Sequence, residues 1–139
     1  MMKVRLVSSV HFSAAHRLHS ESLDEDTNRR TFDKCNNPSA HGHTYALEVT
    51  VEGEIDPATG YVMDVAQLAR VIRERVVEPL DRRHLNHDVD FLSGINPTAE
   101  NIAAGIWARL QGRVAPARLA RVVLNETEKN RVAYKGETP

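Results

Sequence analysis

The chain of 139 residues has one cysteine, few aromatic residues and no long apolar run. A single cysteine cannot form an intrachain disulfide, so the fold does not depend on an oxidising compartment. Basic and acidic side chains number 18 and 19, a balance that gives no support to binding of nucleic acid or a membrane surface. The N-terminal segment has no signal-peptide pattern, and no segment reaches the roughly 20 apolar residues of a membrane-spanning helix. We therefore expect one cytoplasmic domain over residues 1–139.

Alternating apolar and polar residues predict four strands. The clearest segment is 43–54, HTYALEVTVEGE, and 3–16 alternates less regularly. Residues 118–126 and 131–135 are expected to form two closing strands joined by a short turn. Both pairs have the pattern of hairpins, so the sheet is expected to be antiparallel.

Two capped apolar stripes predict two helices between the strand pairs. Asp64 is expected to N-cap the first, with Gln67 completing a capping box, and Pro79 to end it or to follow its last turn. Thr98 is a possible N-cap of the second. Residues 19–40 are polar without periodicity and are expected to form a long loop. The order ββααββ predicts an α+β domain, a four-stranded antiparallel sheet with two helices on one face, whose open edges could pair between subunits.

Histidine is plentiful, with seven in the chain. His41 and His43 begin the clearest strand two positions apart, so both imidazoles point to the same side. His16 ends the first strand, which should pair with the second, and supplies a third imidazole. Three neutral imidazoles suit zinc and leave a fourth position open for water or substrate. The alternative is a structural zinc closed by Cys35 as the fourth ligand.

Cys35 has two interpretations besides that of a ligand. Most free cysteines are small buried apolar residues. The surrounding KCNNP is instead a polar, turn-rich segment. Beside a zinc ion and Lys34 the thiolate would be favoured, and it could act as a base or nucleophile.

Two further polar positions could carry chemistry. Asp81 and His84 lie three residues apart, and an aspartate can fix the tautomer of a histidine, although from these residues alone a solvated helix end is the preferred interpretation. Glu126 follows a strand. It is either solvated or, if it faces a pocket, a bidentate acceptor for a flat N–H and NH₂ edge such as that of a guanidine-like heterocycle.

A set of motifs in a fixed order, covering nearly the whole chain, resembles the 6-pyruvoyltetrahydropterin synthase family. This family includes the bacterial 6-carboxytetrahydropterin synthases of queuosine biosynthesis. The resemblance rests on FSAAHRL, CNNPSAHGHTY, GYVMD, PLD, PTAENIA, the glutamate of LNETEKN and the closing YKGE. It implies the tunnelling fold, in which ββααββ subunits join their sheets in a trimer as a barrel, with two trimers stacked as a homohexamer.

The resemblance also implies roles for single residues. It implies that His16, His41 and His43 bind Zn²⁺, that Cys35 is catalytic, that Glu126 anchors the pterin, that Thr98 lies in the segment that helps to hold it, and that Asp81 belongs to an Asp–His pair.

One position departs from the family pattern. Arg82 stands directly after Asp81, where the family has a histidine, and an arginine cannot exchange protons as imidazole does. His84 or His87 could substitute, or the second acid–base group could be lost. We favour His84, because one helical turn could keep it near Asp81. Arg82 could instead stabilise phosphate.

The resemblance implies 7,8-dihydroneopterin triphosphate as the substrate. Zinc would lower the pKa of the side-chain hydroxyls, and Cys35 as thiolate would remove the proton from the side-chain carbon next to the ring. Triphosphate would then leave by elimination. Arg17 and Lys34 could bind the triphosphate, although either one alone is more often a solvated surface charge.

The product has two alternatives. The Arg- and Ala-rich composition is typical of prokaryotes and favours 6-carboxy-5,6,7,8-tetrahydropterin, released with acetaldehyde and triphosphate in queuosine biosynthesis. The CNNP spacing before HGH is closer to the 6-pyruvoyl type, which keeps the side chain and serves a tetrahydrobiopterin-type pathway. We favour the carboxy product. A non-catalytic zinc- and pterin-binding protein, marked by Arg82, and a generic zinc hydrolase are the alternatives from other classes.

Overall fold

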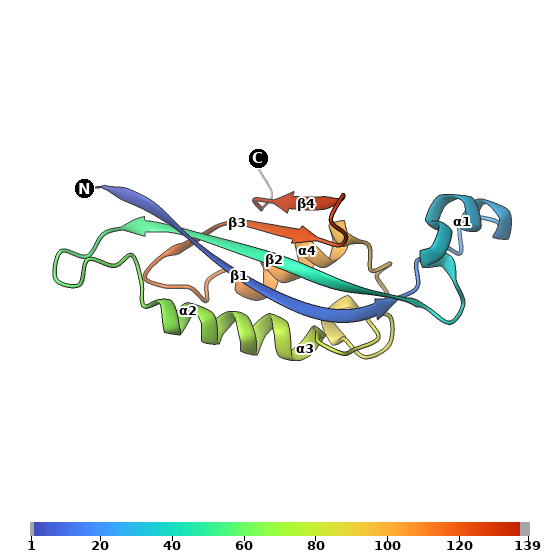
Figure 1. Cartoon of the computed structure of the whole chain (residues 1–139), viewed down its shortest axis with the longest axis horizontal. Coiled ribbons are helices and arrows are strands. Elements are labelled where there is room, and N and C mark those ends of the chain that lie inside the picture. The colour runs from blue at the N-terminus through green and yellow to red at the C-terminus, as the bar shows by residue number, and fades with distance from the viewer. Residues whose placement is uncertain (1, 137–139) are drawn as a thin grey trace.

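A four-stranded antiparallel sheet forms the frame of the molecule (Figure 1). The computed structural model describes residues 2–136, so the glutamate of the closing YKGE motif lies outside the described residues. The strands are β1 (Lys3–His16), β2 (His41–Glu54), β3 (Arg118–Asn125) and β4 (Arg131–Tyr134), in the order β1-β2-β3-β4. β1 and β2 pair along 14 residues each, from Lys3 opposite Glu54 to His16 opposite His41. The predicted α+β sheet is confirmed, with strand ends within two residues of those expected.

Helices cover one face of this sheet. α2 (Val65–Ile72) continues through a π-helical segment, η2 (Arg73–Val77), into the short α3 (Glu78–Leu80), and α4 (Ala99–Leu110) packs beside them. The Asp64 side chain accepts a hydrogen bond from the backbone N–H of Ala66, and that of Thr98 from Asn101, so both predicted N-caps form. Because the Asp64 side chain accepts from Ala66 and not from Gln67, and no hydrogen bond within residues 2–136 runs from the Gln67 side chain to Asp64, the expected capping box does not form. No helix in this part of the chain is long and apolar enough to cross a membrane.

Pro79 lies inside the last helical turn and does not end the helix at its own position. Because proline has no N–H, Pro79 cannot donate to the carbonyl of Arg75, four residues earlier in the helix. Nε of Arg109 donates to the carbonyl oxygen of Arg75 at 3.1 Å, and Nε of Arg75 donates to the carbonyl oxygen of Arg109 at 3.0 Å. The two helix ends are therefore tied together by a reciprocal pair of hydrogen bonds.

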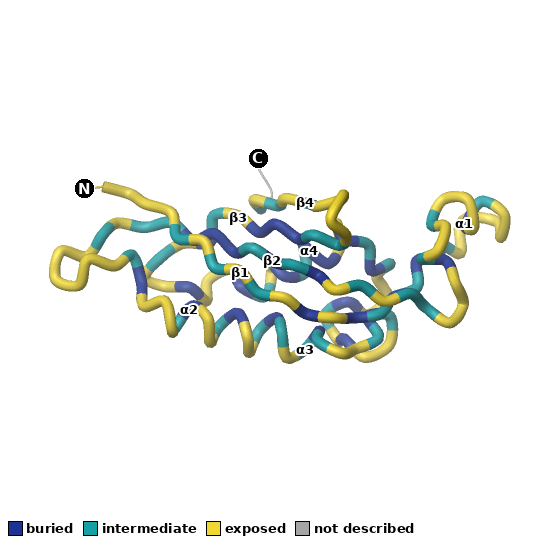
Figure 2. The backbone as a smooth tube through the Cα atoms, viewed as in Figure 1, coloured by how far each residue is buried: buried dark blue, intermediate teal, exposed yellow. Residues whose placement is uncertain are grey.

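The core lies between the helices and one face of the sheet (Figure 2). The inward residues of β2 are fully buried, as the alternation predicts, and the helices bring an apolar stripe against them. These residues are Tyr45, Leu47, Val49, Val51, Leu68, Ile72, Val76, Ile102, Ile106 and Leu110. Val65, also expected in the stripe, is 51% exposed.

The expectation of a loop over residues 19–40 is wrong. The segment contains α1 (Glu25–Phe32) and a 3₁₀ turn, η1 (Asp33–Asn36), at the far end of the sheet. α1 has no apolar stripe. It is held instead by the Asp24 N-cap on the N–H of Thr27 and by Asn28, whose buried side chain bonds the backbone of Ser20, Leu23 and Asp24. The acidic residues in the first turn of α1 and the basic residues in its last turn interact favourably with the helix dipole. This charge pattern was the sequence signal for the helix.

The chain that follows α3 covers the outer edge of β1 near its end. The N–H of Arg82 donates to the carbonyl of Ser13 at 2.6 Å, and that of Leu85 to the carbonyl of Ala15 at 2.8 Å. In return the N–H of Ala15 donates to the carbonyl of Arg83 at 3.0 Å. These bonds place residues 81–85 beside the end of β1 that carries His16.

Candidate metal centre and active site

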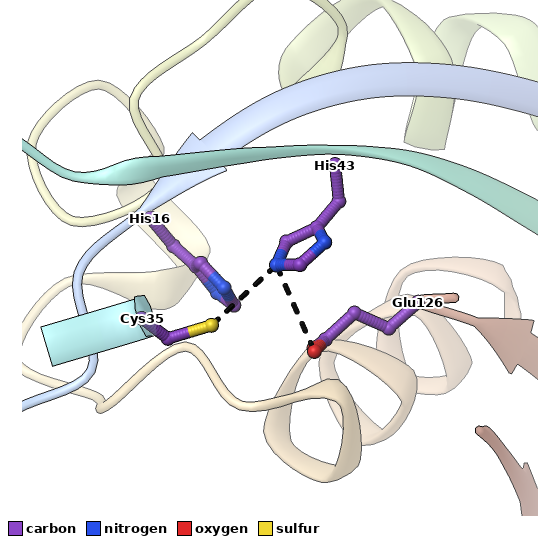
Figure 3. A group of neighbouring side chains, drawn as sticks. All are labelled: His16, Cys35, His43 and Glu126. Atoms are coloured by element: carbon purple, nitrogen blue, oxygen red, sulfur yellow. Dashed lines mark hydrogen bonds and ion pairs between the residues drawn. The ribbon is translucent and has the colours of Figure 1, made fainter. Parts of the chain in front are cut away.

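Four side chains converge at the end of the sheet where β1 ends and β2 begins (Figure 3). They are those of His16, Cys35, His43 and Glu126, and their ligand atoms all lie within 4.8 Å of one another. Nε2 of His43 lies 3.6 Å from Sγ of Cys35 and 3.7 Å from Oε1 of Glu126. We call these four residues the donor cluster.

Strand register and short turns bring the donor cluster together. His16 pairs with His41 across β1 and β2, and His43 lies two residues along on the same face. Glu126 follows β3, whose last residues pair with the start of β2, and its N–H donates to the carbonyl of Asn130 across the hairpin at 3.2 Å. Cys35 is held by its carbonyl, which accepts from the N–H of Leu18 at 2.7 Å, just beyond His16.

Backbone strain is concentrated around these elements. The only non-glycine residues with positive φ in residues 2–136 are Asp33 (50°), Ala40 (73°) and Arg82 (61°). The first two flank the segment that carries Cys35, and the third lies at the edge of β1. Such conformations are unfavourable for residues with a Cβ and are commonly retained at functional sites.

The two histidines of the donor cluster are neutral imidazoles near pH 7. Burial lowers the pKa of His43 to about 4, with smaller contributions from His16 and His41. Burial also lowers the pKa of His16, against the opposing effect of its hydrogen bond to the carbonyl of Pro97. Nδ1 of His16 is 2.8 Å from that carbonyl oxygen, while Nε2 is buried without any hydrogen-bond partner. A neutral imidazole with a free buried nitrogen is suited to binding a metal.

The two acidic members of the donor cluster hold their protons more tightly than usual. Burial, followed by the charges of Glu126 and Asp33, raises the pKa of Cys35. Burial, followed by the charge of Glu100, raises the pKa of Glu126. The protein side chains therefore disfavour the Cys35 thiolate, which a nearby cation would stabilise. Lys34 does not fulfil that expectation, since it is not among the charges that act on this thiol.

The donor set fits zinc or a similar transition metal, because it combines imidazole, thiol and carboxylate. His41, predicted as the third imidazole ligand, is a neighbour of the cluster and not a member of it. Its ring centroid lies 4.8 Å from that of His43, and the His43 ring lies 4.9 Å from that of His16. Cys35 and Glu126, predicted as catalytic residue and pterin anchor, complete the donor cluster with His16 and His43.

Two cavities flank the start of β2. The first, of about 600 Å³, is lined by His41, Arg17, His19, Lys34 and other residues around α1. The second, of about 630 Å³, is lined by His43, Thr44, Arg82 and His84, among others. His41 and His43, two residues apart on β2, thus line different cavities.

Asp81 and His84, expected to act as a pair, have separate partners. Oδ1 of Asp81 accepts from the N–H of Ser13 at 2.9 Å, and its Oδ2 lies 3.9 Å from Nε of Arg82. The His84 ring stacks on His87 with centroids 4.3 Å apart. The helical turn that was expected to join Asp81 to His84 does not form, because the helix ends at Leu80.

Thr98 uses its hydroxyl to cap α4, accepting from the N–H of Asn101 at 3.2 Å. Pro97 and Tyr45, which contact His16, were not singled out from the sequence. Tyr45 lies in the same strand face as His41 and His43, a position that pointed to the site. Every residue has a backbone carbonyl, so no sequence signal could single out that of Pro97.

This antiparallel sheet with helices on one face and a histidine-rich donor cluster at its end is the architecture of a tunnelling-fold protein. A family profile described as 6-pyruvoyl tetrahydropterin synthase matches residues 5–137. The chain belongs to the 6-pyruvoyl tetrahydropterin synthase family, as its motifs predict, and the predicted enzyme class, a lyase, agrees with this membership.

Individual relatives cover most of the chain. The human 6-pyruvoyl tetrahydrobiopterin synthase is 46% identical over 128 residues, which are 92% of this chain and 88% of that protein. The structure of Caenorhabditis elegans 6-pyruvoyl tetrahydropterin synthase is 40% identical, covers 99% of this chain and 98% of its own, and has a TM-score of 0.91. A dihydroneopterin monophosphate aldolase of Pyrococcus furiosus is 41% identical over 110 residues, 79% of this chain and 77% of that protein. The first two names favour the 6-pyruvoyl alternative over the carboxy product preferred from composition.

Proposed function

We propose that the protein is a zinc-dependent 6-pyruvoyltetrahydropterin synthase that eliminates triphosphate from 7,8-dihydroneopterin triphosphate. The observation that carries this proposal is the donor cluster itself, with an unpartnered buried Nε2 of His16 beside Cys35 and Glu126. The 46% identity to the human enzyme supports the same reaction. The runner-up is the 6-carboxytetrahydropterin synthase of queuosine biosynthesis, which would also release acetaldehyde.

His16, His41 and His43 are the proposed zinc ligands. Bound zinc would supply Lewis-acid polarisation of the substrate's side-chain hydroxyls. His16 and His43 are suited to this role because burial keeps both imidazoles neutral. With His41 as the third ligand, Cys35 stays free for chemistry.

Cys35 is the proposed general base. It would take the proton from the side-chain carbon next to the pterin ring, and that electron pair would move into the C=N bond of the ring. Loss of a proton from the next side-chain carbon would then expel triphosphate from the terminal carbon by elimination. Burial raises the pKa of this thiol, so once ionised its thiolate is a stronger base than that of an exposed cysteine.

Glu126 is the proposed pterin anchor. Its carboxylate can accept two parallel hydrogen bonds from the N–H and NH₂ groups on the edge of the heterocycle. It would thereby orient the side chain of the substrate toward Cys35, whose sulfur lies in the same cluster of atoms within 4.8 Å. Thr98, through its cap on α4, would help to shape this end of the pocket.

We place the triphosphate arm in the cavity of Arg17 and Lys34. Nε of Arg17 donates to the carbonyl of Asn36 at 3.1 Å, and Asn86 bonds both the N–H and the carbonyl of Arg17. The remaining guanidinium donors form none of the hydrogen bonds or ion pairs of the described residues, so they are available to phosphate oxygens. The cavity also contains Glu25 and Asp33, which limits its positive charge.

The proposal also covers the oligomer, the remaining proton transfers and the location of the protein. A homohexamer of two stacked trimers would pair the open edges at β1 and β4. Asp81 and His84 are proposed to carry out the remaining proton transfers. A cytoplasmic location fits a small-molecule pterin substrate.

One assay tests the reaction and its alternatives. Zinc-loaded protein is incubated with 7,8-dihydroneopterin triphosphate, and released triphosphate, acetaldehyde and the pterin product are quantified. We expect triphosphate and the 6-pyruvoyl product without acetaldehyde. Stoichiometric acetaldehyde would establish the carboxy reaction, and tight pterin binding without turnover would establish a non-catalytic protein.

A further inference from the structure

The two ring nitrogens of His16 have opposite surroundings. Nδ1 lies 2.8 Å from the carbonyl oxygen of Pro97 and 3.4 Å from Oη of Tyr45. Nε2, on the other side of the ring, is the one buried side-chain nitrogen or oxygen within residues 2–136 that has no hydrogen-bond partner. The ring points toward Cys35 and Glu126 (Figure 3).

The Pro97 contact decides where the imidazole proton lies. A carbonyl oxygen can only accept, so Nδ1 carries the hydrogen and Nε2 keeps its lone pair. The competing arrangement has Tyr45 donating to Nδ1, which would put the proton on Nε2 and block it toward the donor cluster. The shorter distance, 2.8 Å against 3.4 Å, assigns the bond to Pro97.

The turn that carries the Pro97 carbonyl is held by hydrogen bonds to the residue before it. The carbonyl of the preceding residue, Asn96, accepts from the side-chain amide of Asn101 at 2.8 Å and from the N–H of Thr98 at 2.8 Å. The side-chain oxygen of Asn96 accepts from the N–H of His19 at 3.2 Å. The turn before α4 is therefore fixed to α4 through Asn101 and to the chain after β1 through His19.

We propose that the Asn96–Pro97 turn is a positioning element that fixes His16 in the Nδ1–H tautomer, and that Asn101 is the positioning residue that holds this turn. This gives the PTAEN motif a role toward the imidazole in addition to any contact with the pterin. Partners that orient a metal-binding histidine in this way are commonly worth about 10- to 100-fold in metal affinity. The role of this turn in metal binding rests on the proposed zinc site, whereas the assignment of the His16 tautomer does not.

The tautomer is measured on the zinc-free wild-type protein with ring-¹⁵N histidine, by long-range correlation of each ring nitrogen with the carbon-bound protons. We expect His16 as Nδ1–H. The variant Asn101→Ala removes the amide donor to Asn96, and we expect it to populate the Nε2–H tautomer and to weaken zinc binding by about tenfold or more in competition with a chromophoric chelator. Ala104→Gly, one turn further along α4, is the matched control, because it weakens the helix without touching the turn.

The outcomes separate this proposal from the proposed function. A wild-type His16 in the Nε2–H form would overturn it, as would an Asn101→Ala protein with unchanged tautomer and unchanged zinc affinity. Equal losses in Asn101→Ala and Ala104→Gly would show that only helix stability matters and would also overturn it. Tyr45→Phe is expected to leave the tautomer unchanged. Because the wild-type measurement needs neither zinc nor a variant, it decides the assignment even where zinc fails to bind or Asn101→Ala fails to fold.

Discussion

Sγ of Cys35 lies 3.6 Å from Nε2 of His43. This contact allows two roles for the thiol, permanent metal ligand or free base. A closed site with four protein ligands would be structural, whereas a three-ligand site keeps a position for substrate. The proposed mechanism requires the second arrangement.

Replacing Cys35 by alanine separates these roles. As a base, its loss lowers kcat by about 10²- to 10⁴-fold and leaves zinc content unchanged. Zinc is measured by metal analysis after gel filtration, and turnover by triphosphate release. Cys35→Ser is the control for size. Loss of zinc from Cys35→Ala would instead identify a permanent ligand and contradict the proposed base.

His41→Ala tests the third zinc ligand. If His41 binds the metal, its removal lowers zinc affinity strongly, because two imidazoles remain of three. His11→Ala is a matched control, since His11 is an exposed histidine on β1 outside the donor cluster. Wild-type zinc affinity in His41→Ala would mean that the metal is held by the four residues of the donor cluster.

Acid should destabilise the zinc-free protein through His43. Its folded-state pKa of about 4 lies below the ordinary 6.5, so between these values the unfolded chain binds more protons. The free energy of unfolding is therefore unaffected above about pH 7 and falls as the pH drops from 6.5 to about 4. His16 acts in the same direction.

Urea denaturation over this pH range measures the effect. Carboxylates also titrate near its lower end, so the comparison is made with His43→Gln, which cannot gain the proton. We expect the pH slope of the variant to be shallower. Parallel slopes in the two proteins would show that His43 is not responsible.

Glu126→Gln should weaken pterin binding. Hydrogen bonds to charged groups contribute about 1.5–3 kcal/mol, which corresponds to roughly 10- to 100-fold in affinity. Titration of the protein with neopterin, monitored by fluorescence, measures it. Glu128→Gln lies in the same hairpin and keeps the net charge matched. Equal affinities in the two variants would remove Glu126 from the pterin site.

Arg17→Ala and Lys34→Ala should weaken binding of inorganic triphosphate by about tenfold each, by loss of charge-assisted bonds. Calorimetric titration measures this independently of turnover. The same variants should raise KM for the substrate more than they lower kcat. Arg30→Ala is the control, because Arg30 is an exposed arginine of α1 that does not line the cavity. Unchanged triphosphate affinity in both variants would exclude this cavity.

Regular apolar patterns and helix-capping residues made the strands, α2 and α4 predictable from the sequence. β2 alternates because one face packs on the helices, and α2 and α4 begin at side chains that cap them. The prediction missed α1 because the helix is held by the buried amide of Asn28 and not by an apolar stripe. A polar network of this kind has no sequence period.

The candidate site was also predictable in part, because the geometry of strands can be read from the sequence. The register of a hairpin relates His16 to His41 and His43, and the two-residue period of a strand can be read from sequence. The approach of Glu126 to His43 depends on how β3 aligns with β2, which includes a register shift near Thr50. The separation of Asp81 from His84 depends on where a helix ends, the least predictable part of an element.

The donor cluster draws on positions 16, 35, 43 and 126, which span most of the chain. The three proposed zinc ligands lie on the β1–β2 ribbon, but Cys35, Glu126 and the Pro97 carbonyl that contacts His16 join them only in the complete fold, so a partly folded chain lacks the finished site. A ligand that binds only the complete native state stabilises the whole domain by mass action. Metal loss and global unfolding should therefore be one coupled event, and zinc availability during synthesis should set how much of the newly made chain persists.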